Sequence, residues 1–270
     1  MATHRFLRLA FAVALLSLSL RIFPALGEKN KPEIAGTLAD NYLIVDLYAG
    51  GGFRARDTQG RWITFPGDTH MLSMRIGREE YVLYPNMDLR AKVSEPVSIV
   101  GNVAQMTWLV DGVRVQQKLT LMTGIVFISF EVTNLEGLGK NIGVRLLLDL
   151  QVEWNDGATV YVEGYGLVTK ETAFSFPGNL TFDKWWTQGS LNSDFKALCR
   201  FPTTPSKVSF AYWWTARNTV FDYMLDPTRP PFQPYPGTFP ESDTCALIYF
   251  DLGLLLPNRS RTSQITYGLF

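Results

Sequence analysis

The sequence predicts an all-β protein, a large antiparallel β-sandwich of supersandwich-like type built from consecutive hairpins. Three observations lead to this fold class. Apolar side chains alternate with period two in many short runs, as in strands with one buried face. Turn signals recur at short intervals, and no long stretch has helical periodicity. With 270 residues, 19% of them charged, the chain is long enough for one ordered domain with a sizeable core.

Residues 1–27 match a secretory signal peptide. Positively charged residues precede an apolar run over residues 9–20, and a small-x-small cleavage site follows at residues 25–27. The run is too short for a membrane span, which needs roughly 20 residues. We therefore expect a protein secreted to the extracellular space or the cell surface, with a membrane contact only through an uncleaved signal segment.

Residues 28–270 are expected to form a single sandwich domain. Cleavage after Gly27 removes three arginines and no acidic residue, which leaves 22 basic residues against 25 acidic ones and a net charge of −3. This balance lacks the basic footprint of a nucleic-acid-binding protein. The expected partners are glycans or other surface proteins, and no nucleic acid.

The first half of the domain reads as a series of hairpins. Strands are expected at residues 42–48, 71–76, 81–84, 104–110 and 113–122, and a hairpin that turns at residues 57–60 is expected over residues 53–65. The strongest turn signal is Asp111-Gly112, because a type I′ turn needs positive φ at both central residues. The triple glycine at residues 50–52 indicates a bulge or turn, since neither a lysine-serine pair nor a helical pattern follows it as in a phosphate-binding loop.

The stretch from Ile125 to Gly157 predicts a hairpin at the centre of the sandwich. One face of its first strand carries apolar residues at 126, 128, 130 and 132, and one face of its second strand carries them at every even position from 142 to 150. Strands resume at 207–214, 243–251 and 262–269. The six prolines within residues 216–242 exclude regular ladder pairing, so this Pro-rich loop is expected to be extended and at the surface.

Export would place the two cysteines in an oxidising compartment. Cys199 and Cys245 are then expected to form one disulfide, and the alternative is two buried free thiols.

Several segments together resemble a known family. The runs VTNLEG, NIGVRLLLDL and WNDGA, followed by a Pro-rich aromatic loop and a terminal TYGL, are similar to secreted archaeal and bacterial β-sandwich modules without an assigned activity. The match includes Asn155-Asp156-Gly157 and Tyr267-Gly268-Leu269, whereas Leu150, Thr159 and Val160 depart from the family pattern. The resemblance implies a cell-surface module whose sheets are distantly galactose-mutarotase-like, which is a fold-level analogy and carries no function.

The polar end of the second central strand holds the candidate ligand-binding residues, which are Asp149, Glu153, Trp154, Asn155 and Asp156. Four of them, Asp149, Glu153, Asn155 and Asp156, carry the hard oxygen atoms that Ca²⁺ prefers, so calcium is the one cofactor considered. The favoured alternative is a turn whose side chains bond their own backbone. Glycoside hydrolysis would need two carboxylates, from these acids and Glu163, with tryptophans as sugar-stacking surfaces.

Catalysis is not expected. After cleavage His70 is the one remaining histidine, so the histidine pair of mutarotase-type proton transfer cannot form. Each tryptophan doublet, 185–186 and 213–214, should place at least one ring in the core, with Trp186 and Trp213 or their neighbours as candidates for an exposed patch. The sequence thus favours a non-catalytic structural or binding module. The alternatives are a carbohydrate-binding or carbohydrate-active sandwich and a filament subunit that donates its terminal strand, residues 262–269.

Overall fold

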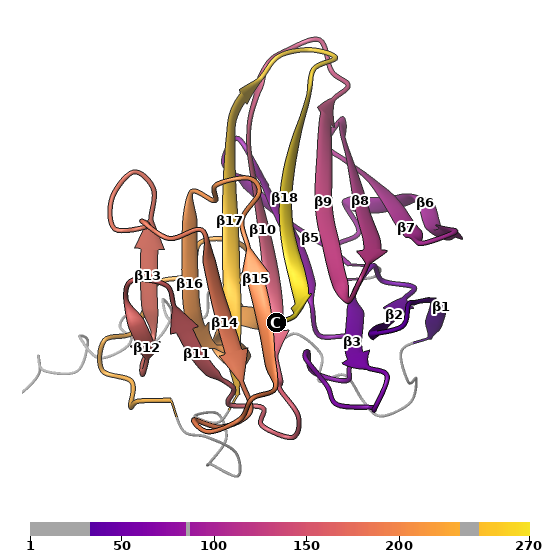
Figure 1. The fold of residues 1–270 in the computed structure, drawn as a ribbon. Helices are drawn as coiled ribbons and strands as arrows, with labels where there is room; N and C mark the ends of the chain where they lie inside the picture. Colours follow the sequence, from indigo (N-terminus) through magenta and orange to yellow (C-terminus); the bar gives the residue numbers. More distant parts are fainter. Residues whose placement is uncertain (1–32, 85–86, 233–242) are drawn as a thin grey trace, which may run out of the picture. The chain divides into compact units, whose positions relative to one another are not determined.

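The protein was described from a computed structural model, in which residues 33–84, 87–232 and 243–270 are placed. Nearly all its regular structure is β, in three antiparallel sheets of three, six and nine strands (Figure 1). This confirms the predicted all-β antiparallel sandwich. The expected signal peptide lies outside the described residues. In the part of the chain that is described, no helix is long and apolar enough to cross a membrane.

The nine-stranded sheet forms one layer of the sandwich. From edge to edge its strands are β12 (Gly166–Val168), β11 (Thr159–Val162), β14 (Lys184–Gln188), β15 (Lys196–Arg200), β18 (Ser260–Leu269), β9 (Ile125–Asn134), β8 (Val113–Met122), β7 (Val103–Val110) and β6 (Ala91–Val100). The β7–β8 hairpin turns at Asp111-Gly112, where both residues have positive φ, as the sequence predicts.

The six-stranded sheet forms the other layer, and a small sheet packs beside the two. The six strands are, in order, β13 (Thr172–Ser175), β16 (Lys207–Tyr212), β17 (Thr244–Leu255), β10 (Lys140–Leu150), β4 (Met71–Ile76) and β5 (Glu79–Leu83). The small sheet consists of β1 (Ile34–Ala39), β2 (Leu43–Tyr48) and β3 (Phe53–Asp57). Alternate residues of all three sheets meet in one apolar core.

The expected central hairpin is wrong, although both of its strands exist. β9 pairs with β8 and β18 in the nine-stranded sheet, whereas β10 pairs with β4 and β17 in the six-stranded sheet. The loop at residues 135–139 therefore crosses from one layer to the other, at the end where β17 also passes to β18 (Figure 1). Two strands that face each other across a core share the same alternation as two strands that pair, so the pattern does not distinguish them.

Strand donation by the C-terminus is contradicted. Residues 260–268 of β18 pair with β9, and residues 266–269 pair with β15 on the other side. A strand that is already paired with β9 along its length and with β15 at its end is built into its own sheet, which counts against its donation to a neighbouring subunit.

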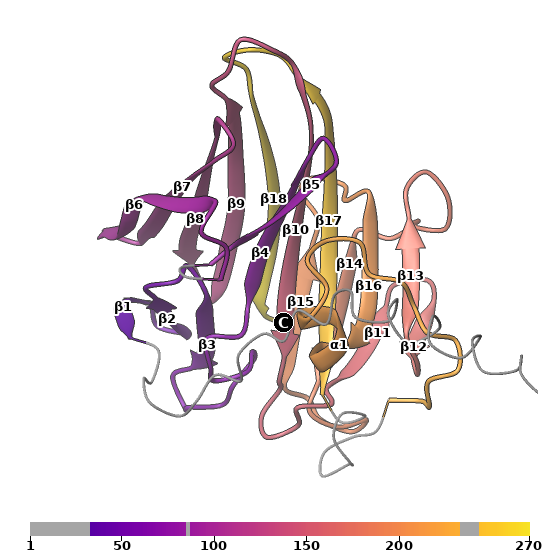
Figure 2. The same ribbon diagram turned by 180° about the vertical axis from the view of Figure 1, so that it is seen from behind.

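The outer face of the six-stranded sheet is covered by the chain itself. The short helix α1 (Trp213–Arg217) lies over β10, β16 and β17, as the view from behind shows (Figure 2). Phe221 and Tyr223 follow it and are buried with Leu147 and Cys245 in a second apolar cluster. This corrects the prediction of an extended surface loop over residues 216–242, of which residues 233–242 lie outside the described part.

The covering segment packs because its apolar residues precede its prolines. The prolines begin at residue 227, whereas the buried aromatic residues lie before residue 224. Glu171 holds the segment in place, since its carboxylate accepts hydrogen bonds from the backbone N–H of Tyr212 at 3.2 Å and of Asp226 at 2.9 Å. The outer face of β10 and β17 is therefore part of the interior.

Candidate functional site

The predicted strand-end residues lie at a tight turn directly after β10. Val152 and Asn155 exchange two backbone hydrogen bonds, of 3.2 and 3.0 Å, and Glu153 takes a positive φ of 57° within the turn. The segment is thus a compact turn, but it lies at residues 152–155 and not at Asn155-Asp156-Gly157, and the Asn155 side chain bonds Gly189 instead of its own backbone.

The turn separates the five candidate ligand residues. The Asn155 amide donates to the carbonyl oxygen of Gly189 at 2.6 Å, and the Glu153 carboxylate accepts from the hydroxyl of Ser193 at 3.2 Å. Trp154 projects into solvent with 77% of its surface exposed. The expected calcium ligands Asp149, Glu153, Asn155 and Asp156 are consequently not brought together as a set.

Two of the predicted acids do meet, and a third joins them from a distant strand. Asp149, Asp156 and Asp243 each bring a carboxylate oxygen within 4.8 Å of the other two. Asp243 immediately precedes β17, whose first residues pair with the end of β10 (Leu150 opposite Thr244). The Asp156 carbonyl oxygen accepts from the Thr244 N–H at 3.2 Å, which fixes the loop beside the strand. These three residues are called the aspartate cluster below.

Burial and mutual repulsion raise the pKa values of the aspartate cluster. Burial and the charge of Asp243 hold the pKa of Asp149 well above its usual range. Burial raises the pKa of Asp156 to about 6. Burial together with Asp156 raises the pKa of Asp243 to about 8, against the opposing charge of Arg217. The fold thus holds these carboxyl groups where their charged forms are costly.

His70 lies next to this region but has a structural role. Its ring is 97% buried, stacks on Phe53 at 4.4 Å between centroids, and accepts the Asp149 N–H through Nδ1 at 2.9 Å. Burial lowers its pKa to about 3, so it stays neutral. The prediction of an ordinary core histidine fits this position.

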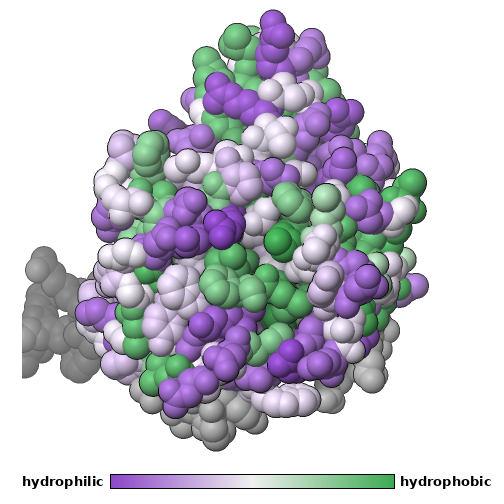
Figure 3. Space-filling model, viewed as in Figure 1, coloured by the Kyte–Doolittle hydropathy of each residue, from purple (hydrophilic) through white to green (hydrophobic). Residues whose placement is uncertain are grey.

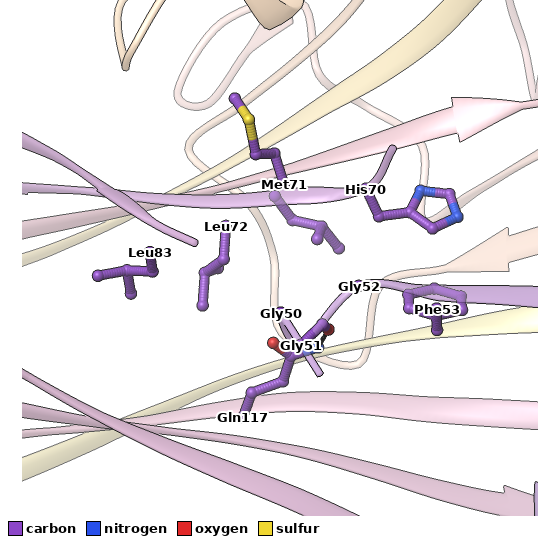
Figure 4. A pocket seen from close by; sticks show the side chains of 10 residues that line it. Gly50, Gly51, Gly52, Phe53, His70, Met71, Leu72, Leu83 and Gln117 are labelled. Carbon is purple, nitrogen blue, oxygen red and sulfur yellow. Dashed lines mark hydrogen bonds between the residues drawn. The ribbon is translucent and has the colours of Figure 1, made fainter. Parts of the chain in front are cut away.

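The triple glycine beside His70 forms a tight turn around a very small cavity. Figure 4 shows Gly50, Gly51 and Gly52 next to Phe53 and His70, with Gln117 donating to the Gly51 carbonyl oxygen at 3.0 Å. The cavity measures about 10 Å³, which is room for one water molecule. The glycines serve the turn, as predicted, and form no cradle of ligand size.

The expected disulfide between Cys199 and Cys245 is wrong, because both residues are buried free thiols. Cys199 on β15 faces the core between the two large sheets. Cys245 on β17 faces the opposite side of the six-stranded sheet, under α1. The two side chains therefore lie on different faces of the sandwich.

The outer face of the nine-stranded sheet carries a row of outward apolar residues that runs across the strands. Successive pairings place in one line Leu167 of β12, Tyr161 of β11, Trp186 of β14, Leu198 of β15, Gly268 of β18, Ile125 of β9 and Met122 of β8. We call it the apolar row. Its only gap is Gly268, where a side chain would collide with the carbonyl oxygen of Gly124.

Aromatic rings dominate one half of the apolar row. The Tyr161 and Trp186 rings are parallel within 6° at a centroid distance of 5.6 Å, and the 71% exposed Phe270 ring lies 6.4 Å from Trp186. Figure 3 shows hydrophobic residues gathered near the centre of this face, over the ends of β15, β18 and β9. Polar groups flank them, among them the ion pair of Lys184 with Glu163 at 2.6 Å.

The tryptophan doublets behave differently from each other. Trp185 is fully buried and Trp186 is outward on the sheet, as a strand requires. β16 ends at Tyr212, so the second doublet begins the helix α1. There Trp213 is buried and its neighbour Trp214 is 48% exposed, so one ring of the doublet is in the core, as expected.

Comparisons with known proteins found similar folds but no related sequence. No model of a protein family matches the sequence, and no curated protein does. The expected family of secreted modules therefore stays a prediction. Among solved structures, a galactose mutarotase-like protein from Lactobacillus casei aligns over 87% of this chain and 99% of its own, at 10% identity and a TM-score of 0.53.

A second solved structure gives the same answer. An aldose epimerase homologue from C. elegans aligns over 87% of this chain and 98% of its own, at 8% identity and a TM-score of 0.51. Identities this low show the fold alone. The chain thus has the β-sandwich fold seen in galactose mutarotase-like proteins.

Proposed function

We propose that the protein is a non-catalytic carbohydrate-binding module, exported from the cell, that holds a glycan chain along the apolar row. The observation that carries the proposal is the aromatic half of the row, in which Tyr161, Trp186 and Phe270 lie side by side on an open sheet face. Sugar rings present apolar C–H faces that pack on aromatic rings, while their hydroxyl groups need polar neighbours.

The surroundings of the apolar row suit such a ligand. Exposed apolar surface of this extent, rimmed by polar groups, is typical of binding faces. Lys196 lies over the Phe270 ring at 5.7 Å. The Lys184–Glu163 pair lies beside Trp186 and Tyr161, with Lys184 on the strand of Trp186 and Glu163 directly after the strand of Tyr161. These charged groups can donate to and accept from sugar hydroxyls without leaving the sheet. The mutarotase-like fold, found in proteins named for sugar conversion, supports the carbohydrate class.

We propose a non-catalytic role because neither histidine of the sequence is available for proton transfer. Sugar epimerisation of the mutarotase type uses histidine and a carboxylate for proton transfer near neutral pH. The sequence has two histidines, His4 and His70. His4 belongs to the expected signal peptide, and His70 is a neutral core residue. The open sheet face consequently offers acids, lysines and aromatic rings for binding, with His70 held on a different layer.

Glycan binding by matched tryptophan variants tests the proposal. The secreted protein, whose mature N-terminus is expected at Glu28, is screened on a glycan array and its best ligand is titrated. We expect Trp186→Ala to weaken binding at least tenfold, a loss of about 1.4 kcal/mol. Its free energy of unfolding should fall by less than about 1 kcal/mol, because the ring is partly in solvent.

Two other exposed tryptophans serve as controls. Trp214→Ala removes a ring of α1 on the opposite layer and should leave glycan affinity unchanged. Trp154→Ala removes the exposed ring of the predicted strand-end site. If Trp154→Ala abolishes binding while Trp186→Ala does not, the glycan binds at the strand end, and the proposed binding site on the apolar row is wrong. No binding to any glycan on the array would overturn the proposed function as a whole.

A further inference from the structure

In the aspartate cluster, one carboxylate oxygen of each residue lacks a hydrogen-bond partner. Asp149, Asp156 and Asp243 each have a buried Oδ1 that makes no hydrogen bond within the described structure. Asp149 is 2% exposed and Asp243 is 7% exposed, so water does not solvate these oxygens freely. Buried polar atoms are ordinarily bonded, and an unpaired buried charge costs several kcal/mol. The arrangement calls for a positively charged ligand between the three side chains.

The protein itself supplies too little positive charge. Arg217 is the basic residue whose charge acts on Asp149 and Asp243. Its guanidinium stacks over the Trp213 ring at 4.7 Å and makes no ion pair with the cluster in the described part of the chain. If all three carboxyl groups are ionised, as metal ligands are, one arginine leaves about two negative charges uncompensated. One divalent cation would balance them.

The ligand atoms define the kind of cation. All three residues offer carboxylate oxygen, and neither histidine nor cysteine belongs to the cluster. Such hard oxygen ligands suit Ca²⁺, Mg²⁺ or Mn²⁺, whereas Zn²⁺ prefers nitrogen and sulfur. Ca²⁺–oxygen distances of about 2.3–2.6 Å put opposite ligands about 5 Å apart, and Mg²⁺ draws them to about 4 Å. A spread of up to 4.8 Å fits around Ca²⁺.

A fourth oxygen lies at the edge of the cluster. The Thr69 hydroxyl is buried beside the Asp149 carboxyl group and opposes the rise in its pKa. Thr69 directly precedes His70, whose Nδ1 accepts the Asp149 N–H and so ties this loop to the end of β10. The cluster is thus built from three separate segments, residues 69–70, 149–156 and 243, all fixed by backbone or ring contacts.

We propose that Asp149, Asp156 and Asp243 bind one divalent cation, with Ca²⁺ preferred, where β10 and β17 begin to pair under α1. Three carboxylates provide the protein ligands, and water completes the six to eight oxygens that Ca²⁺ takes. The cation ties the loop after β10 to the start of β17 and thereby stabilises the covered face. The site is independent of the apolar row, which lies on the other sheet.

Titration of the metal-stripped protein tests the site. The full secreted protein is treated with EDTA, dialysed, and titrated with CaCl₂ by calorimetry, up to about 10 mM because extracellular calcium modules bind at about 0.1–1 mM. We expect one saturable site per chain and a rise in Tm of at least about 5 °C at a hundredfold excess over Kd. Parallel titrations with MgCl₂ and MnCl₂ should give weaker binding.

Matched aspartate variants make the result specific. Asp243→Asn and Asp156→Asn should each weaken Ca²⁺ binding at least tenfold, and either variant suffices if the other fails to fold. Asp251→Asn is the control, because Asp251 is exposed on the same strand β17 and lies outside the cluster. It should bind Ca²⁺ like the parent protein.

The change in Tm caused by Asp243→Asn, measured with and without Ca²⁺, distinguishes a metal site from a cluster of carboxyl groups that binds no metal. In EDTA, Asp243→Asn should raise Tm in both cases, because it removes a repelling charge. In Ca²⁺ it should lower Tm relative to the parent protein only if a cation is bound. A higher Tm for Asp243→Asn in both buffers, or no saturable binding of any of the three cations, would overturn the proposal. Equal loss of affinity in Asp251→Asn would do the same.

Discussion

The outer faces of the two large sheets differ in what they meet. In β8 of the nine-stranded sheet, buried and outward residues alternate along the whole strand. In β10 of the six-stranded sheet, every residue from Ile142 to Leu150 is buried, because α1 and the segment after it cover the outer face. The open face can receive a ligand of molecular size. The covered face instead encloses polar groups, among them Arg145, Asp149 and Cys245, whose charges and bonds must be satisfied inside the protein.

The covered face of β10 carries two buried charged residues whose surroundings differ. Arg145 is fully buried and donates to the Phe221 carbonyl oxygen at 3.3 Å and to the Ser73 hydroxyl at 3.2 Å. These neutral oxygens bond two of its nitrogens, whereas Nε has no hydrogen-bond partner in the described structure. A few residues further along the same strand, Asp149 finds no such partner for Oδ1. The two residues differ in their neighbours, since Arg145 donates to neutral oxygens whereas Asp149 lies beside the carboxylates of Asp156 and Asp243.

The largest expected effect is a loss of stability when either of two neighbouring buried leucines of β10 is shortened. Leu147 and Leu148 point to opposite sides of β10 and are both fully buried. Leu147→Ala and Leu148→Ala should each lower the free energy of unfolding by about 2–5 kcal/mol. Two neighbouring residues of β8, in the sheet with the open face, should differ. Leu119→Ala should lower the free energy of unfolding by about 2–5 kcal/mol and Thr120→Ala by less than about 0.5 kcal/mol.

Urea denaturation of the four variants measures these differences. If Leu147→Ala unfolds at the same urea concentration as the parent protein, α1 does not cover the six-stranded sheet and the comparison fails. A similar cost for Leu119→Ala and Thr120→Ala would show that the nine-stranded sheet is covered as well.

A medium effect concerns Asp68, an acid at the rim of the covered face. Burial raises its pKa from 3.8 to about 6, although Tyr84 donates to it at 2.6 Å and the charge of Arg217 opposes the shift. A pKa raised in the folded state means that its contribution to stability is fully present below pH 3.8 and is lost as pH rises to about 6. We expect a loss of about 1–2 kcal/mol over this range, discounted for partial exposure.

The Asp68→Asn variant isolates that contribution, since asparagine does not titrate. The difference in unfolding free energy between variant and parent protein, measured from pH 4 to pH 7, should change in favour of the variant as pH rises. A difference that is constant with pH would mean that Asp68 keeps its ordinary pKa and that the rim is open to solvent.

The smallest expected effect concerns the two thiols. Cys199 on the nine-stranded sheet faces the core, whereas Cys245 on the six-stranded sheet faces away from it, and both are free. A reductant should therefore shift Tm by less than about 1 °C. Thiol titration of the denatured, unreduced protein should find two thiols per chain. A value of zero, with a large drop in Tm on reduction, would restore the disulfide and contradict the placement of these strands.

Part of the candidate site could be predicted because it is local in sequence. The loop after β10 brings Asp149 and Asp156 close together over few residues, and the Asp-rich pattern is visible there. Asp243 could not be found in this way. It reaches the site because β17 pairs with β10 across a separation of about ninety residues, and nothing in the local pattern selects β17 over another strand as the partner. For the same reason, the sequence did not predict that Glu153 and Asn155 would bond residues 189–193.

What the sequence determined by itself is set by short-range physics. Period-two alternation specifies strands and the direction of each side chain, so the β class, the inward row of β10 and the outward Trp186 follow from it. The Asp111-Gly112 turn follows from the φ angles that these residues tolerate. Tertiary structure alone decided which strands pair, which layer each enters, and which outer face the chain covers. Those choices depend on the free energy of packing distant segments, and they alone assemble the aspartate cluster and leave the apolar row in solvent.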